Sequence, residues 1–239
     1  MTRLSVNINK IATLRNARGG SVPDLLMAAQ DIQRFGAEGI TVHPRPDERH
    51  IRRQDVYDLK KVVYTEFNIE GYPSEDFLSL IGDIRPAQVT LVPDPPEVIT
   101  SNAGWDTRTH KPFLTECISR LKAYGCRVSL FIAPDENMIG HAKEAGADRV
   151  ELYTEEYARQ YPASPEKAIE PFARAARHAR EIGIGLNAGH DLSLVNLEYF
   201  AAHIPDLLEV SIGHALVCDS LYLGLENAVQ LYIRKLGRP

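Results

Sequence analysis

The sequence lacks several features that mark common classes of protein. No run of 18 apolar residues is present, which argues against a membrane-spanning helix. The first seven residues, MTRLSVN, form no apolar signal-peptide region, and no GxGxxG dinucleotide fingerprint follows an apolar run. Lysine and arginine number 27 against 32 aspartates and glutamates, so a basic nucleic-acid-binding face is not expected. We therefore expect a cytoplasmic protein with no membrane or nucleic-acid partner.

Cysteine is scarce as well. Cys117, Cys126 and Cys218 are odd in number and form no CxxC pair. This pattern argues against a disulfide framework and a catalytic thiol, and it predicts small buried cysteines in a reducing compartment.

The sequence does contain a regular alternation of short β-rich runs and stretches of helical period. The expected strands are Leu4–Asn9, Ile40–His43, Thr65–Glu70, Gln88–Val92, Arg127–Ile132, Arg149–Tyr153, Gly185–Ala188 and Leu208–Ile212. The clearest helices are Val22–Phe35, Glu75–Ile84, Leu114–Tyr124, Glu136–Ala145 and Pro165–Ile182. Four helices are expected to end at a glycine in the left-handed conformation, namely Gly36, Gly125, Gly146 and Gly183. The pattern predicts an α/β fold, a (β/α)8 TIM barrel with extra short helices, as a single domain over residues 1–239. A doubly wound open sheet is the alternative.

Most of the expected strands are apolar on one face and polar on the other. In a barrel the apolar face must pack against the helices, so the polar face should point into the barrel. Buried charges need partners, because unpaired burial costs several kcal/mol per ion. We therefore predict an interior network in which two arginines lie among three glutamates: Arg127, Arg149, Glu66, Glu151 and Glu209.

Residues 39–51 (GITVHPRPDERHI) are the most informative stretch. The strand must end at His43, because the prolines that follow cannot donate ladder hydrogen bonds. The stretch then carries Arg45, Arg49 and His50 on a stiff loop. An acid/base group beside guanidinium groups suits an anionic substrate. A solvated basic loop is the alternative interpretation.

In a (β/α)8 barrel the active site lies at the carboxyl ends of the strands. The residues at those ends are Asn7, Asn9, Lys10, His43, Arg45, Glu70, His190, Gly213 and His214. Two histidines and a carboxylate at one mouth form a plausible acid/base set. Ser211–Ala215 would supply backbone N–H groups for a phosphate at the start of the last barrel helix. Lys10 raises a rival Schiff-base mechanism, although its polar loop surroundings disfavour it.

The longest irregular stretch is Pro93–Lys111, which holds the only tryptophan, Trp105. A loop of this length on the site side of a barrel favours a lid. We expect Trp105 fluorescence to change when substrate binds.

With these residues assembled, the sequence resembles the pyridoxine 5′-phosphate synthase family of vitamin B6 biosynthesis over nearly its whole length. The resemblance rests on residues 6–19 (VNINKIATLRNARG), residues 39–51, the strand that ends at Glu70, and the segments SLFI (129–132), NAGH (187–190) and IGHA (212–215). It implies a barrel with added helices that forms a homo-octamer, a tetramer of dimers. It also implies a transferase-type, ring-forming condensation of 1-deoxy-D-xylulose 5-phosphate with 3-amino-2-oxopropyl phosphate, without metal or organic cofactor.

The resemblance also implies roles for individual residues. His43 and Glu70 look like bases and His190 like the acid. The other residues look like substrate ligands: Arg45, His50 and Thr100 for the deoxyxylulose phosphate, and Asn7, Arg18, Gly213 and His214 for the aminoketone phosphate, with Arg18 acting across a dimer interface.

Two places depart from one common form of the family motif. That form has Asp-His where this chain has Asn9-Lys10, and Gly where it has Asp191. We predict that Asn9, Lys10 and Asp191 contact substrate, although Asn9 cannot supply a carboxylate. Two other hypotheses remain open at this point: a phosphosugar aldolase or isomerase, and a non-catalytic barrel that binds phosphorylated metabolites.

Overall fold

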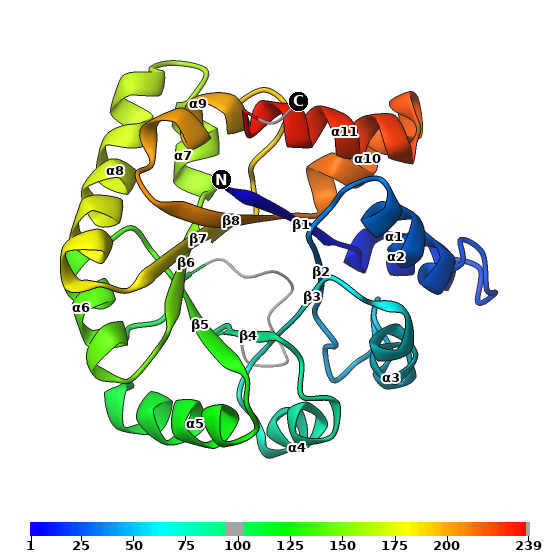
Figure 1. Ribbon diagram of the computed structural model, residues 1–239, viewed down its shortest axis with the longest axis horizontal. Coiled ribbons are helices and arrows are strands. Elements are labelled where there is room, and N and C mark those ends of the chain that lie inside the picture. Colours follow the sequence, from blue (N-terminus) through cyan, green and yellow to red (C-terminus); the bar gives the residue numbers. More distant parts are fainter. Residues whose placement is uncertain (94–102, 238–239) are drawn as a thin grey trace.

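The computed structural model describes residues 1–93 and 103–237. In this part of the chain, eight parallel strands close into a barrel in sequence order (Figure 1). The strands are β1 (Arg3–Asn7), β2 (Gly39–Val42), β3 (Glu66–Gly71), β4 (Gln88–Leu91), β5 (Arg127–Ile132), β6 (Arg149–Tyr153), β7 (Gly185–Gly189) and β8 (Leu207–Ile212). The closed order confirms the (β/α)8 barrel and excludes the doubly wound sheet.

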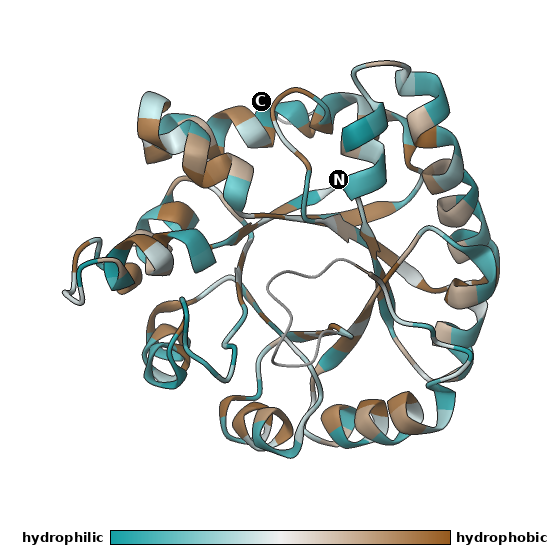
Figure 2. Cartoon of the chain, turned by 180° about the vertical axis from the view of Figure 1, so that it is seen from behind, coloured by the Kyte–Doolittle hydropathy of each residue, from teal (hydrophilic) through white to brown (hydrophobic). Residues whose placement is uncertain are grey.

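Helices surround the strands as an outer ring (Figure 1). They are α1 (Asn9–Asn16), α2 (Leu25–Arg34), α3 (Arg53–Val62), α4 (Glu75–Ile84), α5 (Lys111–Ala123), α6 (Glu136–Glu144), α7 (Glu155–Gln160), α8 (Pro165–Ile182), α9 (Leu197–His203), α10 (His214–Leu223) and α11 (Leu225–Lys235). Most of them carry both hydrophilic and hydrophobic residues (Figure 2). In the described residues no helix has the length and apolar character needed to cross a membrane.

The glycines that were expected to end helices do so. Gly183 caps α8 with φ 70°, and Gly36, Gly125 and Gly146 follow α2, α5 and α6 with φ of 103°, 85° and 94°. Each N–H of these four glycines donates to a carbonyl of the preceding turn. Glycine adopts this left-handed conformation at little cost, which returns the chain toward the next strand.

The first βα connection differs from the prediction. β1 ends at Asn7 rather than Asn9, and residues 9–16 form α1 instead of a basic loop. Ile11, Ala12 and Arg15 are the buried positions of α1, which is the i, i+1, i+4 spacing of one helical face. The next helix begins at Leu25 rather than Val22, because Asp24 caps it by accepting hydrogen bonds from the N–H groups of Leu26 and Met27.

The two faces of the strands divide as predicted. Leu4, Val6, Val128, Leu152 and Val210 are fully buried in the core between strands and helices. Polar side chains fill the barrel interior. At mid-height they form a hydrogen-bonded chain in the order Ser5, Thr41, Asn68 and Thr90, with distances of 2.7, 3.3 and 3.1 Å.

The predicted charged network occupies the amino-terminal end of the barrel. Arg127 pairs with Glu66, and the Arg149 guanidinium lies 4.0 Å from the Glu209 carboxylate, with both of these side chains buried. Arg3, which the prediction omitted, adds a second contact to Glu66 at 3.1 Å.

Glu151 was wrongly included in that network. Its carboxylate accepts a hydrogen bond from the Thr90 hydroxyl at 3.4 Å and lines the cavity at the other end of the barrel. The reason is its position along the strand: Glu151 is two residues beyond Arg149, and two residues advance a side chain by about 6.6 Å on the same face.

The expected lid is described only in part. Thr100 and the rest of residues 94–102 lie outside the described residues. Trp105 is 4% exposed, and its backbone and its indole ring are both hydrogen-bonded to neighbouring strands. Its backbone N–H donates to the Phe131 carbonyl at 2.9 Å and its indole N–H donates to the Leu91 carbonyl at 3.0 Å.

Candidate active site

A cavity of about 570 Å³ opens at the carboxyl ends of the strands. It brings together eleven of the residues that the sequence assigned to the site: Asn7, Asn9, Lys10, His43, Arg45, His50, Glu70, His190, Asp191, Gly213 and His214. Arg49, Phe131, Glu151 and Ser211 also contribute to its wall. Arg18 is exposed beyond the end of α1 and does not line this cavity.

The centre of the cavity is a buried imidazole beside a buried carboxyl group. His43 Nδ1 lies 4.0 Å from Glu70 Oε2. Burial raises the pKa of Glu70 to about 8, against the opposing charge of Arg45. Burial, followed by the charges of Arg45, His50 and Arg49, lowers the pKa of His43 well below its usual value. A proton shared by this pair therefore resides on Glu70, which leaves His43 neutral with a lone pair available as a base.

Two asparagines hold this pair in place. The Asn7 amide donates to Glu70 Oε2 at 3.3 Å, and the Asn7 side-chain oxygen accepts from the Asn9 N–H at 3.0 Å. The Asn9 side-chain oxygen accepts from the His43 N–H at 3.0 Å. Asn9 thus fixes the end of β2 through a contact that needs an acceptor oxygen but no negative charge.

Glu151 belongs to the cavity, whereas its place in the strand pattern predicted a position among the arginines. It is 3% exposed, and burial together with the charge of Glu70 raises its pKa to about 8. Two buried carboxyl groups that repel each other cannot readily both ionise, so one of them holds a proton near neutral pH. Counting residues from the end of β6 would have placed Glu151 at the mouth rather than in the arginine layer.

His50 lies at the edge of the cavity as a neutral hydrogen-bond donor. Burial and the charges of Arg45 and Lys10 lower its pKa to about 4. The Ile51 N–H donates to His50 Nδ1 at 2.9 Å, so the ring hydrogen is on Nε2. Next to the guanidinium of Arg45, this N–H makes the loop after β2 suitable for an anion.

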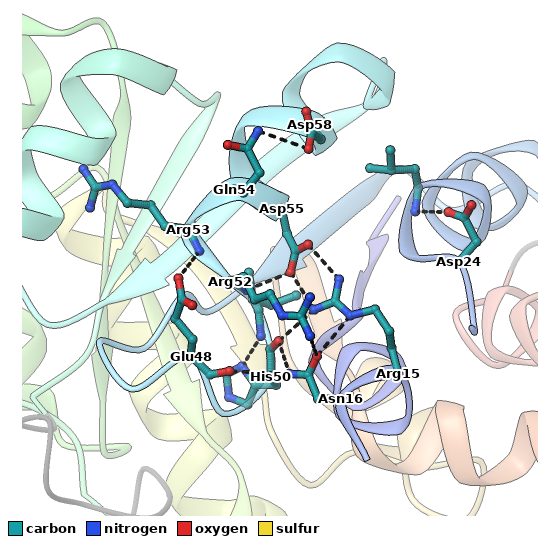
Figure 3. A network of polar contacts seen from close by, with 12 residues as sticks. Arg15, Asn16, Asp24, Glu48, His50, Arg52, Arg53, Gln54, Asp55 and Asp58 are labelled. Carbon is teal, nitrogen blue, oxygen red and sulfur yellow. Dashed lines mark hydrogen bonds and ion pairs between the residues drawn. The ribbon is translucent and has the colours of Figure 1, made fainter. Parts of the chain in front are cut away.

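The loop that carries His50 is anchored to α1 (Figure 3). The His50 carbonyl accepts hydrogen bonds from Arg15 at 3.2 Å and from Asn16 at 2.8 Å. Arg15 also donates two bonds to Asp55 on α3. Arg15 and Asn16 therefore support the loop that carries His50, a role that their place in a basic segment did not indicate.

A second candidate anion-binding position lies at the start of α10. Gly213 is the N-cap residue and His214 the first helical residue, with no side chain capping the helix. Uncapped N–H groups at a helix N-terminus attract anions. A Cβ on Gly213 would lie 3.0 Å from Asn7 Cβ, so glycine is needed for the close approach to β1. In the closed barrel β1 lies between β8 and β2. The candidate anion position after β8 is therefore separated from the one after β2 by a single strand, β1.

The described residues contain no group of three or more histidine, cysteine, aspartate or glutamate side chains arranged to hold a metal ion. The three cysteines are free, and burial raises the pKa of both the Cys117 and Cys126 thiols to about 11. Cys218 is only partly buried, contrary to the expectation for all three.

These features are those of a (β/α)8-barrel enzyme, with a candidate acid/base site between two candidate anion-binding positions. The family model described as "Pyridoxal phosphate biosynthesis protein PdxJ" matches residues 4–238, and the chain belongs to this family. Curated relatives named pyridoxine 5′-phosphate synthase include one from Cytophaga hutchinsonii, 64% identical over 100% of both chains. Another, from Bacteroides fragilis, is 63% identical over 97% of this chain and 98% of its own length.

Solved structures of other barrels are similar in fold alone. A tryptophan synthase structure from M. tuberculosis has a TM-score of 0.64 at 13% identity, and covers 99% of this chain and 92% of that one. A phosphoribosylanthranilate isomerase from Thermotoga maritima has a TM-score of 0.61 at 12% identity, with 99% of each chain covered.

Proposed function

We propose that this protein is a pyridoxine 5′-phosphate synthase that condenses 1-deoxy-D-xylulose 5-phosphate with 3-amino-2-oxopropyl phosphate, with release of phosphate and water. The observation that carries the proposal is the convergence of His43, Glu70 and His190 on one cavity that is also lined by Arg45, His50, Gly213 and His214, the residues of two candidate anion-binding positions. Two phosphorylated substrates that must react with each other need such an arrangement, since their charges must be neutralised while their reacting atoms are held together.

The proposed binding follows the two anion positions. Arg45 and His50 hold the deoxyxylulose phosphate through a guanidinium and a neutral N–H. Gly213 and His214 hold the aminoketone phosphate at the start of α10. Asn7, between the two positions, donates a hydrogen bond to substrate or to Glu70. Thr100 remains a predicted ligand of the deoxyxylulose phosphate, outside the described residues.

The proposed chemistry uses the aminoketone's own amine. An imine forms between the two substrates, so no lysine of the enzyme is required. His43 then removes a proton as the neutral base, and Glu70 and Glu151 receive and return protons with pKa values near the working pH. His190 protonates the departing group. Elimination of phosphate and water, followed by ring closure, gives the aromatic product.

The experiment is direct. Purified protein is incubated with both substrates, and pyridoxine phosphate is followed by absorbance while free phosphate is measured. Product formation that needs both substrates is expected. Turnover of either substrate alone, or trapping of Lys10 by borohydride with a carbonyl substrate, would favour the aldolase or isomerase reading instead. Tight binding without turnover would favour a non-catalytic barrel.

We also propose a homo-octamer built from four dimers, in which Arg18 reaches the cavity of a partner subunit. Arg18 is exposed and does not line the cavity of its own chain, which suits a role in a neighbour's site. Light scattering tests the assembly. Mixing Arg18→Ala and His43→Ala subunits tests the shared site, because mixed dimers should regain activity that neither variant has alone. Absence of recovery after confirmed subunit exchange would contradict the role of Arg18.

A further inference from the structure

His190 and Asp191 form a close pair just after β7. His190 Nδ1 lies 2.6 Å from Asp191 Oδ2. A carboxylate can only accept a hydrogen bond, so the shared hydrogen belongs to Nδ1. The other ring nitrogen, Nε2, is then the one available to the cavity that both residues line. The contact therefore selects one tautomer of the imidazole.

Neighbouring elements fix the backbone of Asp191. Its N–H donates to the Thr154 hydroxyl at 3.1 Å, and this hydroxyl in turn donates to the Gly189 carbonyl at 2.7 Å. The Asn196 side-chain amide donates to the Asp191 carbonyl at 3.2 Å. Thr154 is fully buried, so the carboxylate of Asp191 projects from a braced segment.

The His190 ring is also held from other directions. Its backbone has φ 93°, a conformation that favours glycine and persists in other residues only when the surroundings impose it. The ring meets Tyr153 edge-on, with centroids 5.0 Å apart and an interplanar angle of 85°, and Phe131 lies at 6.5 Å. An aromatic wall and a carboxylate together define where the imidazole can lie.

We propose that Asp191 is the positioning residue for His190: it holds the imidazole in the Nδ1–H tautomer with Nε2 directed at the reacting atoms. This role replaces our sequence-based prediction that Asp191 binds substrate. Its carboxylate is engaged with the imidazole, and a free carboxylate beside two phosphorylated substrates would weaken their binding by repulsion. The inference rests on the proposed synthase reaction, in which His190 is the acid: Nε2 takes up a proton to give the imidazolium, and this proton then passes to the departing group while the Nδ1–H stays bound to Asp191.

Steady-state kinetics separate positioning from substrate binding. Asp191→Ala should lower kcat by about tenfold to a hundredfold, because a misplaced general acid loses part of its contribution to the rate. Both KM values should stay within about threefold of those of the wild type. Asp191→Asn, which keeps the shape and one acceptor oxygen, should fall between the wild type and the alanine variant. Asp206→Asn is the matched control, because it removes an exposed carboxylate from the loop before β8. A wild-type kcat in Asp191→Ala, or an effect confined to KM, overturns the proposal.

A double-mutant cycle tests whether Asp191 acts through His190. In a His190→Ala background, measured over long incubations, Asp191→Ala should change kcat by less than about twofold, because the group that it positions is gone. A further loss as large as that in the wild-type background overturns the proposal and indicates an independent or structural role.

A spectroscopic measurement does not depend on turnover. Protein labelled with ¹⁵N-histidine has eight such residues, and loss of one signal set in His190→Ala assigns the ring of interest. Solid-state ¹⁵N spectra at a pH where the ring is neutral should show the hydrogen on Nδ1 in the wild type, and a loss of this preference in Asp191→Ala. A hydrogen on Nε2 in the wild type overturns the inference. Failure to form product would overturn the proposed function, but not this tautomer assignment.

Discussion

The guanidinium of Arg15 donates two hydrogen bonds to the carboxylate of Asp55, at 2.7 and 2.8 Å. This pair joins α1 to α3 across the loop after β2, and the same guanidinium holds the His50 carbonyl (Figure 3). Arg15 is only 6% exposed. A buried arginine with this two-pronged geometry fixes the orientation of its neighbours, and here the neighbour is an anion-binding loop.

The first prediction concerns the stability of this link. Asp55→Ala should lower the free energy of unfolding by about 3 kcal/mol, because it leaves the Arg15 charge buried without its carboxylate. It also removes the bond from the Arg52 N–H that caps α3. Urea denaturation monitored by circular dichroism measures the change.

The control is an exposed ion pair that joins the same helix, α3, to α4. Arg53 pairs with Asp76 at 2.9 Å, but these side chains are 38% and 78% exposed. Asp76→Ala should therefore cost less than about 1 kcal/mol. Equal losses in the two variants would show that burial does not distinguish the pairs.

The second prediction concerns the two central acid/base groups. His43→Ala and Glu70→Gln should each lower turnover by at least about a hundredfold, the usual effect of removing such a group. Both variants should still bind inorganic phosphate, since Arg45 and the start of α10 are unchanged. Near-normal turnover in either variant would refute the role of that residue.

The third prediction concerns the coupling of Glu70 to Glu151. The pH profile of kcat/KM should show an ascending limb near pH 8, where Glu70 ionises and becomes a base. Glu151→Gln should move this limb to lower pH, because a neutral amide replaces a carboxyl group whose charge opposes ionisation of Glu70. A limb that stays in place would mean that the two groups titrate independently.

The sequence predicted most of the architecture for a physical reason. Alternating polar and apolar residues in the strands and glycine after the helices are local patterns. Each of them is compatible with only a few backbone structures, so it can be recognised from the sequence. Strand ends could be located to within two residues, and in a closed parallel barrel those ends must meet. The convergence of His43, Glu70 and His190 on one cavity follows from that geometry.

The missing parts depend on contacts that no local pattern encodes. Glu151 and Arg149 have the same parity on β6, and parity alone does not indicate their partners: Arg149 lies beside Glu209, whereas Glu151, two residues farther along the strand, contacts Thr90 and lines the cavity. Asp191 lines the cavity, as the sequence-based prediction of a substrate contact requires. Its contact with His190 was not predicted, because it depends on a backbone conformation at position 190 that the sequence does not reveal.

The last prediction concerns Glu209, in the charged layer at the amino-terminal end of the barrel. Burial and the neighbouring Glu66 raise its pKa to about 8. Between its usual pKa near 4.5 and this value, the folded protein keeps a proton that the unfolded chain has lost. Stability should therefore fall as pH rises through this window.

Glu209→Gln tests this expectation, since the amide has the shape of the protonated acid and cannot ionise. We compare the free energy of unfolding of the variant with that of the wild type at pH 5 and at pH 8. This difference should shift in favour of the variant by about 2 kcal/mol from pH 5 to pH 8, which is less than the full difference between the folded and unfolded pKa values of Glu209 would give. Arg149 also donates a hydrogen bond to the Asn187 side chain at 3.1 Å, and this bond does not involve Glu209. Glu181→Gln, at an exposed position of α8, should show no such change. If thermal denaturation gives parallel pH curves for Glu209→Gln and the wild type, Glu209 is already ionised in the folded protein and Arg149 compensates its charge.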